Sequence, residues 1–394
     1  MVCSRFVYLD NSATTPVRPE VVAAMEQALR ETFGNPSARH HLGLAAEKAL
    51  QEAREQVAGV LGVAPEEIIF TSGGTEANNL ALKGLARALR RRGRHLITTM
   101  VEHPSVLNTC RQLEEEGFAV TYLPVDASGC LDAARVAAAL RPDTVLVSIM
   151  HVNNEVGAVQ PIEAVGRLLA ARPEKVYFHV DAVQSFARLP LKPGAWHLDL
   201  VSISAHKIHG PKGVGALYVR RGTRLAPLMG GGDQEGGLRP GTENVPGIVG
   251  FGTAASLAAG DAAAGERMAA LRRRLWEGIS RAVPEVRYNG PPPERAAPHI
   301  LNVSFEVQAE VLLHALEAVG IYVSSGAACH SRRPEPSHVL AAMGLKGSAL
   351  AGAIRFSLSP LTTAEDIDYT VAKLGELVPQ LRRYQGRRRT TRGK

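Results

Sequence analysis

The sequence LDLVSISAHKIHGPKGVGALYVR, residues 198–220, places two short apolar runs on either side of a polar segment. The runs 198–204 and 214–220 have the length and β-branched content of buried strands. Helical patterns, such as EANNLALKGLARALRRRG at 76–93, separate these and similar earlier runs. The alternation predicts an α/β fold whose seven-stranded, mostly parallel sheet is covered by helices on both faces. The other five runs are 67–72, 95–100, 119–124, 144–150 and 176–181.

The rest of the chain predicts a second, smaller domain. The glycine-rich stretch 229–247 marks the end of the sheet domain, and PPPERAAP at 291–298 is a break. Short apolar runs at 300–305, 321–325 and 353–358 alternate with helical patterns, which favours a small α+β domain. We expect an N-terminal arm (1–20) packed against this domain, a large domain (21–255), the small domain (256–381) and a basic disordered tail (382–394).

The formal charge of +7 is concentrated at the C-terminus. Seven of the 45 basic residues lie in 382–394, which leaves 38 basic against 38 acidic residues elsewhere. A basic tail is typical of a solvated terminus, and contact with nucleic acid or an acidic partner is the alternative. The chain has no membrane-length apolar run and no signal-peptide stretch, so we expect a cytoplasmic protein. The spacing of its four cysteines predicts free thiols and no metal site.

A possible phosphate site follows the first predicted strand, in TSGGTEANN at 71–79. Gly73 and Gly74 allow the backbone to approach an anion closely, and the helix that follows offers its free N–H groups. Thr75 adds a hydroxyl group. An ordinary strand-to-helix turn is the alternative for this motif taken alone.

A reactive lysine is predicted in SISAHKIHGPKG at 202–213. Lys207 follows a strand at the carboxyl edge of the sheet, where open α/β sheets bind ligands. A lysine that is desolvated there can form an imine. Ser204 and His206 are placed to donate hydrogen bonds to a phosphate group.

A buried carboxylate completes the pattern. Asp181 ends the strand in VYFHVDAVQS at 176–185, and burying it calls for a cationic partner. A protonated pyridine nitrogen would be such a partner, with Gln184 near the ring oxygen. A helix N-cap is the alternative for Asp181 alone. Together with the phosphate site and Lys207, these residues match pyridoxal phosphate, a phosphorylated pyridine aldehyde.

Two further residues suggest the reaction. His103 in VEHPSVLN follows a strand end, where it can stack on a ring and move protons, although a structural histidine is the alternative. Cys329 in SSGAACHSRRPEPSHVL lies in a polar segment beside His330 and two arginines. Nearby cations favour a thiolate, so Cys329 is a candidate nucleophile.

These motifs resemble the cysteine desulfurases, a branch of the class-V aminotransferases with the aspartate-aminotransferase-like fold (fold type I). The resemblance extends over nearly the whole chain and is specific. It is carried by LDNSATTP (9–16), FGNPSA (33–38), TSGGTEANN, VEHPSVLN, HVNNEVG (151–157), HVDAVQ, SAHKIHGPKG, RPGTEN (239–244), SSGAAC, EPSHVLAAMG and IRFSLSP (354–360).

The resemblance implies a role for each matching residue. Lys207 would bind pyridoxal phosphate as a Schiff base, His103 would stack on its ring, and Cys329 would take up sulfur. Arg355 and Asn35 would bind the substrate carboxylate, and the family forms homodimers. The implied cofactor contacts are Gly74, Thr75, Ser204 and His206 at the phosphate, Thr242 at the phosphate of the other subunit, Asn154 and Gln184 at the ring substituents, and Asp181 at the pyridine nitrogen.

The implied activity converts L-cysteine to L-alanine and leaves the sulfur as a persulfide on Cys329. An acceptor protein would then use the sulfur for iron–sulfur clusters or thiolation; an iron–sulfur scaffold, a tRNA-thiolation protein and a DNA sulfur-modification system all remain open. A selenocysteine lyase is the main alternative, whereas an aminotransferase has no need of Cys329. One departure is the run Asp233–Gly237, where many relatives have Gln-Glu-Arg-Gly: the arginine is missing and one residue is added.

Overall fold

The structure is a computed structural model that describes residues 5–325 and 336–391, with the backbone alone for 385–391. The strands are β1 (Val7–Tyr8), β2 (Ile68–Thr71), β3 (His95–Thr99), β4 (Ala119–Leu123), β5 (Thr144–Met150), β6 (Tyr177–Asp181), β7 (Leu200–Ser204), β8 (Gly215–Val219), β9 (Arg287–Asn289), β10 (Ile300–Ser304), β11 (Ile321–Tyr322), β12 (Ser324–Ser325) and β13 (Ala353–Ser357). The α-helices are α1 (Pro19–Glu31), α2 (His41–Leu61), α3 (Gly74–Leu89), α4 (Pro104–Glu115), α5 (Ala133–Ala139), α6 (Ile162–Ala170), α7 (Val245–Gly260), α8 (Ala264–Ala282), α9 (Ala309–Glu317), α10 (His338–Ala342), α11 (Gly347–Ala351) and α12 (Ala364–Thr391).

The large sheet has seven strands in the order β2-β8-β7-β6-β5-β3-β4. Each of the seven apolar runs identified in the sequence contains one of these strands. Strand β8 is antiparallel to its neighbours β2 and β7, and the other pairs are parallel. The predicted α/β fold with a mostly parallel seven-stranded sheet is therefore confirmed.

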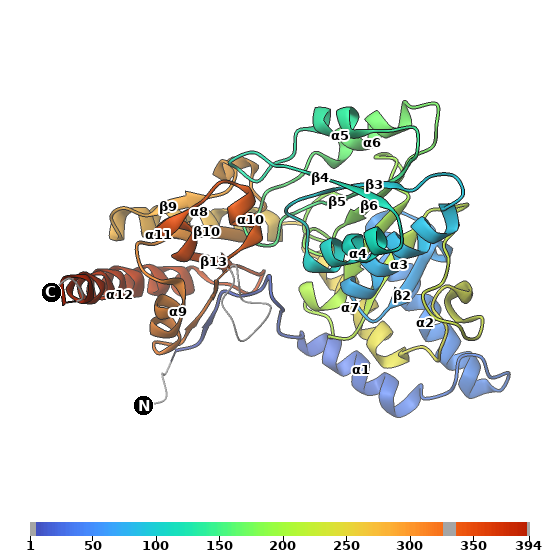
Figure 1. Cartoon of the computed structure of the whole chain (residues 1–394). Coiled ribbons are helices and arrows are strands. Elements are labelled where there is room, and N and C mark those ends of the chain that lie inside the picture. Colours follow the sequence, from blue (N-terminus) through green and yellow to red (C-terminus); the bar gives the residue numbers. More distant parts are fainter. Residues whose placement is uncertain (1–4, 326–335, 392–394) are drawn as a thin grey trace.

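Helices cover both faces of this sheet because its strands are apolar on both faces. Along β2, Ile68 and Phe70 belong to the core cluster that contains residues of α2 and α7, whereas Ile69 packs with residues of α3 and α4. This alternation follows from the two-residue period of side chains along a strand. Figure 1 shows the sheet with α1–α7 forming one body of the molecule.

The second body contains a four-stranded antiparallel sheet in the order β12-β13-β10-β9. Helices α8, α9 and α12 pack on it around a separate core that includes Leu275, Leu312 and Leu374. Strand β1 of the N-terminal segment pairs with β11, and Leu9 joins the same core. The segment then runs on to α1 in the large body, so it connects the two parts (Figure 1).

The structure differs from the sequence prediction at the C-terminus. We expected a disordered tail from Arg382, but α12 continues to Thr391. The physical reason is that arginine and glutamine are good helix formers, so the amphipathic helix that precedes them can propagate. Helices α7 and α8 are separate elements, since α7 ends at Gly260 and α8 begins at Ala264.

Candidate active site

A cavity of about 240 Å³ lies where the carboxyl ends of β5, β6 and β7 meet the first turns of α3 and α4. Parallel strands end at the same edge of a sheet, and this edge is the usual ligand site of open α/β sheets. The structure brings most of the predicted site residues together here. Those that line the cavity are Gly74, Thr75, His103, Asn154, Asp181, Gln184, Ser204, His206, Lys207 and Arg355.

One end of the cavity is suited to an anion. Gly73 has φ 151° and ψ −179°, a conformation available essentially only to glycine, and it leads directly into α3. A Cβ atom on Gly74 would lie 2.6 Å from Val183 Cγ2, so the backbone approaches its neighbour closely. The first turn of α3 provides unpaired N–H groups and a favourable dipole for a phosphate.

Ser204, the last residue of β7, and His206, two residues further on, also line the cavity. Ser204 Oγ is buried and lacks a hydrogen-bond partner in the described part of the chain. His206 Nδ1 lies 3.1 Å from Thr14 Oγ1. Burial, and to a smaller extent the charge of Lys207, lowers the pKa of His206 to about 4, so its ring is neutral at pH 7. Buried polar atoms normally have partners, so Ser204 Oγ fits a phosphate oxygen.

Lys207 lines the cavity and belongs to the short 3₁₀ helix η2 (Ala205–Lys207) that follows β7. Its Nζ donates to the carbonyl oxygens of Ser12, at 2.5 Å, and Ala13, at 2.7 Å. Both carbonyls belong to the N-terminal segment. That segment is therefore a wall of the site, and it holds the lysine amine inside the cavity.

Asp181 ends β6 and exposes only 6 % of its surface. Its carboxylate accepts hydrogen bonds from Val183 N, at 3.0 Å, and Asn78 Nδ2, at 2.8 Å. Both of these donors are uncharged. A buried carboxylate favours a cationic ligand, and a protonated pyridine nitrogen fits this requirement.

His103 is the N-cap residue of α4. Its Nδ1 accepts a hydrogen bond from Ser105 N at 3.1 Å and lies 2.8 Å from Ser105 Oγ. Ser105 Oγ in turn accepts from Asn78 Nδ2 at 2.9 Å. The imidazole is therefore fixed at the cavity wall on its Nδ1 side.

Arg355 enters the cavity from β13 of the small sheet. Its Nη2 donates to Asp10 Oδ1 at 2.6 Å, and its Nη1 donates to the Asn154 carbonyl at 3.1 Å. Arg355 thus brings a fixed guanidinium group from the small sheet to the cavity. A guanidinium group so placed is suited to a carboxylate ligand.

Two predicted site residues that the structure describes do not line this cavity, and a third is not described. Asn35 is exposed, and its Oδ1 accepts from Ser37 N at 2.9 Å. Thr242 is also exposed, between the 3₁₀ helix η3 (Gln234–Gly237) and α7. Cys329 lies outside the described residues.

The structure adds residues to which the sequence analysis gave no role. The cavity lining also includes Ser12, Ala13, Asn78 and Ser105. All four lie inside motifs that carried the family resemblance, which was the available signal. Their contacts depend on which carbonyl or amide faces the site, and the residue types alone do not determine that.

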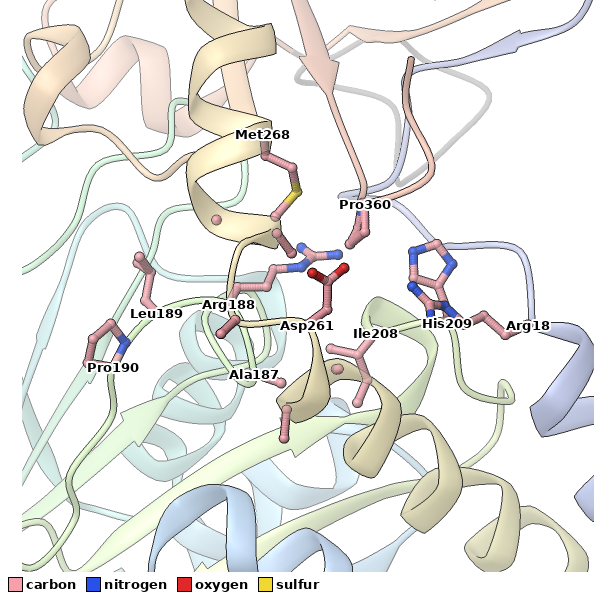
Figure 2. Close-up of a pocket in the computed structure, with 15 residues that line it drawn as sticks. Arg18, Ala187, Arg188, Leu189, Pro190, Ile208, His209, Asp261, Met268 and Pro360 are labelled. Carbon is pink, nitrogen blue, oxygen red and sulfur yellow. The ribbon is translucent and has the colours of Figure 1, made fainter.

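A second cavity, of about 250 Å³, lies on another side of the Lys207 backbone and contains none of the predicted site residues that the structure describes. Figure 2 shows Arg188 and Asp261 pointing toward one another in it, with His209 and Arg18 beside them. Arg188 Nη2 donates to the carbonyl oxygen of Lys207. Burial lowers the pKa of Arg188 to about 10. This hydrogen bond therefore helps to fix the position of the Lys207 backbone.

No group of histidine, cysteine, aspartate and glutamate side chains among the described residues could hold a metal ion. None of the helices in the described ranges is long and apolar enough to cross a membrane.

Comparison with known proteins agrees with this geometry. The family model of the class-V aminotransferases matches residues 7–370. The cysteine desulfurase IscS of Dictyoglomus turgidum is 47% identical over 380 residues, which are 96% of each chain. A solved NifS-like protein superposes with a TM-score of 0.90 at 42% identity, covering 96% of this chain and 100% of its own. A solved structure described as SspA in complex with cysteine gives a TM-score of 0.80 at 41% identity, covering 91% and 100%.

The chain belongs to the cysteine desulfurases of the class-V aminotransferase family. The predicted family and fold type I are thereby confirmed, and so is pyridoxal phosphate as the cofactor of this class of enzyme.

In this desulfurase, the loop that departs from the family pattern, Asp233–Gly237, contains the buried residue Glu235. Glu235, at φ 47°, forms a buried ion pair with Arg54 at 2.7 Å and also accepts from Phe70 N at 2.8 Å. The glutamate thus ties the loop to β2. The altered positions, Asp233 and Gly236, lie on either side of Glu235.

Proposed function

We propose that this chain is a pyridoxal-phosphate-dependent cysteine desulfurase that converts L-cysteine to L-alanine and carries the sulfur as a persulfide on Cys329. The observation that carries the proposal is the meeting of Lys207, Asp181 and Arg355 with an anion-binding helix terminus in one cavity. The cavity contains a group suited to each part of the cofactor and substrate, namely a phosphate, a pyridine nitrogen, an aldehyde carbon and an amino-acid carboxylate. The cysteine bound in the SspA structure supports the choice of substrate.

Each cofactor-binding residue would contact a different part of the cofactor. The first turn of α3 and Ser204 would hold the phosphate, Gln184 and Asn154 would lie at the ring substituents, and Asp181 would keep a proton on the ring nitrogen. Pyridoxal phosphate supplies an electron sink that stabilises negative charge at the substrate Cα. Lys207 would bind the cofactor and, once released by the substrate amine, move the proton at Cα.

Arg355 would set the orientation of the substrate. A fixed guanidinium group can bind a carboxylate through two hydrogen bonds. This contact would fix the orientation of the bound substrate. His103, which also lines the cavity, would contact the ring face and move protons near neutral pH.

Sulfur transfer would proceed by attack of the Cys329 thiolate on the substrate sulfur. The Cβ–Sγ bond breaks, an S–S bond forms, and a proton from the site completes the methyl group of alanine. The other cysteines within the described ranges are poorly suited to this step. Burial raises the pKa of Cys110 to about 12, and burial also raises the pKa of Cys130.

The quaternary structure and the partners are further parts of the proposal. A homodimer would explain why Thr242 and Asn35 are exposed in one chain, since Thr242 would reach the phosphate of the partner subunit. The acceptor would be an iron–sulfur scaffold or a thiolation protein, and the iron–sulfur use is supported by the naming of the relatives. We place the enzyme in the cytoplasm. The same names favour cysteine over selenocysteine as the substrate.

The test begins with Lys207→Ala. Purified enzyme should be yellow, and it should release alanine and, with a thiol reductant, sulfide from L-cysteine. The variant should lose alanine release completely while still binding the cofactor through its phosphate contacts. A wild-type protein that binds no pyridoxal phosphate, or a Lys207→Ala variant with normal turnover, would contradict the proposal. Sizing of the holoenzyme, with Thr242→Ala as the variant expected to retain less cofactor, tests the dimer.

A further inference from the structure

Asn78 connects two walls of the active-site cavity. It lies on α3, exposes 1 % of its surface, and its single Nδ2 nitrogen donates to both Asp181 Oδ2 (2.8 Å) and Ser105 Oγ (2.9 Å). An amide nitrogen has two hydrogens, so both bonds can be made at once. Rotating the amide by half a turn would place Oδ1 against the Asp181 carboxylate. The two contacts therefore settle the orientation of the amide.

The chain of hydrogen bonds continues from Ser105 to His103. Ser105 Oγ lies 2.8 Å from His103 Nδ1, and the backbone N–H of Ser105 donates to the same nitrogen at 3.1 Å. A backbone N–H is only a donor, so Nδ1 carries no proton. Since Ser105 Oγ already accepts from Asn78, its own hydrogen is free to point at Nδ1. The proton of the neutral imidazole must then be on Nε2.

We infer that Asn78 and Ser105 are positioning residues that hold His103 as the Nε2–H tautomer and couple it to Asp181. The inference rests on the proposed function, in which His103 contacts the ring face and Asp181 the ring nitrogen. Neither Asn78 nor Ser105 needs to touch the reacting atoms to act in this way. Both are buried and both line the cavity.

The network determines the direction in which His103 exchanges protons. In the resting enzyme, His103 offers a hydrogen at Nε2. It takes up a second proton only at Nδ1, where the backbone N–H opposes it and the Ser105 hydroxyl would have to turn its hydrogen away. The network therefore resists formation of the imidazolium as the pH falls. Removing the hydroxyl should allow His103 to be protonated at a higher pH.

The decisive variants are Ser105→Ala and Ser105→Thr in the holoenzyme. Alanine release is measured from pH 5.5 to 10. In Ser105→Ala, the acidic limb of the kcat/KM profile should move to higher pH by about 0.5–1 unit, which corresponds to the free energy of one hydrogen bond. The kcat of this variant should be about three- to tenfold lower, and its KM should stay within about twofold of the wild-type value. Ser105→Thr keeps the hydroxyl and should restore the wild-type profile. Thr109→Val removes another buried hydroxyl of α4 and should leave the profile unchanged.

A double-mutant cycle tests whether Asn78 acts on His103 through Ser105. If Asn78 acts through Ser105, the shift of the acidic limb in Asn78→Ala/Ser105→Ala should be clearly smaller than the sum of the single shifts. The inference would be overturned if the two single-variant shifts of the acidic limb were additive, or if the acidic limb of Ser105→Ala lay at the same pH as that of the wild type. Failure of the proposed function would look different, because the wild-type holoenzyme itself would release no alanine.

Discussion

Arg355 Nη2 donates to Asp10 Oδ1 across 2.6 Å, and this ion pair joins β13 of the small sheet to the N-terminal segment. The Arg355 side chain exposes only 4 %, and its Nη1 is held by the Asn154 carbonyl. Asn154 and Arg355 lie on the same cavity wall. The guanidinium group is therefore held from two sides before any carboxylate arrives, which limits the entropy lost on substrate binding.

This relationship predicts the effect of Arg355→Lys. Lysine keeps the charge but cannot reach Asp10, Asn154 and a carboxylate with one planar fork. The KM for L-cysteine should rise about 10- to 100-fold, equivalent to about 1.4–2.8 kcal/mol, with a smaller change in kcat. Steady-state alanine release measures both constants. Arg30→Lys, which changes an exposed ion pair on α1, is the control and should behave as wild type. An unchanged KM in Arg355→Lys would remove Arg355 from the carboxylate site.

A second prediction concerns the turn that leads into α3. Gly73→Ala places a Cβ on a residue at φ 151°, which is strained by about 1–3 kcal/mol even though space is open around it. The strain should distort the N–H groups that would hold the phosphate, so the dissociation constant for pyridoxal phosphate should rise about tenfold or more. Equilibrium titration of the apoenzyme measures this constant. Gly59→Ala on α2, also with open space but an ordinary helical backbone, should bind the cofactor normally.

A third prediction concerns the buried Glu102 beside His103. Burial raises the pKa of Glu102 from 4.5 to about 8, so the folded state keeps a proton that the unfolded state releases near pH 4.5. Its contribution to stability is therefore lost as the pH rises through about 8. Between pH 6 and 9, the wild type should lose about 2–3 kcal/mol more unfolding free energy than Glu102→Gln. Urea unfolding at both pH values tests this. The exposed variant Glu55→Gln should keep the wild-type dependence, whereas equal slopes in wild type and Glu102→Gln would refute the assignment.

Local sequence pattern was sufficient to predict the large sheet. Each of its strands is a short apolar run between turn residues, and burial on both faces makes such runs conspicuous. Strand β9, at Arg287–Asn289, was missed because it is short and polar and is recruited by pairing with β10. The helical end of α12 was missed because a block of basic residues is equally typical of a solvated terminus.

Site residues could be predicted from the sequence where the chemical task requires a particular residue type. Lys207, Asp181 and the glycines before α3 are of this kind, and all lie at the expected sheet edge. Backbone contacts were not predictable, since any residue could supply the carbonyls of Ser12 and Ala13 that hold the lysine amine. The link from Asn78 through Ser105 to His103 also depends on how α3 and α4 pack side by side. No local pattern in the sequence encodes that packing.

Cys329 provides the most direct test of the account. After one turnover with L-cysteine, mass spectrometry of the wild-type enzyme should show one added sulfur on the peptide that contains Cys329. Cys329→Ser should keep the cofactor absorbance and bind cysteine, yet lose alanine production by several orders of magnitude, because a hydroxyl is a far poorer nucleophile toward sulfur at neutral pH. Sulfur found on Cys3, Cys110 or Cys130 instead, or normal turnover by Cys329→Ser, would contradict the account.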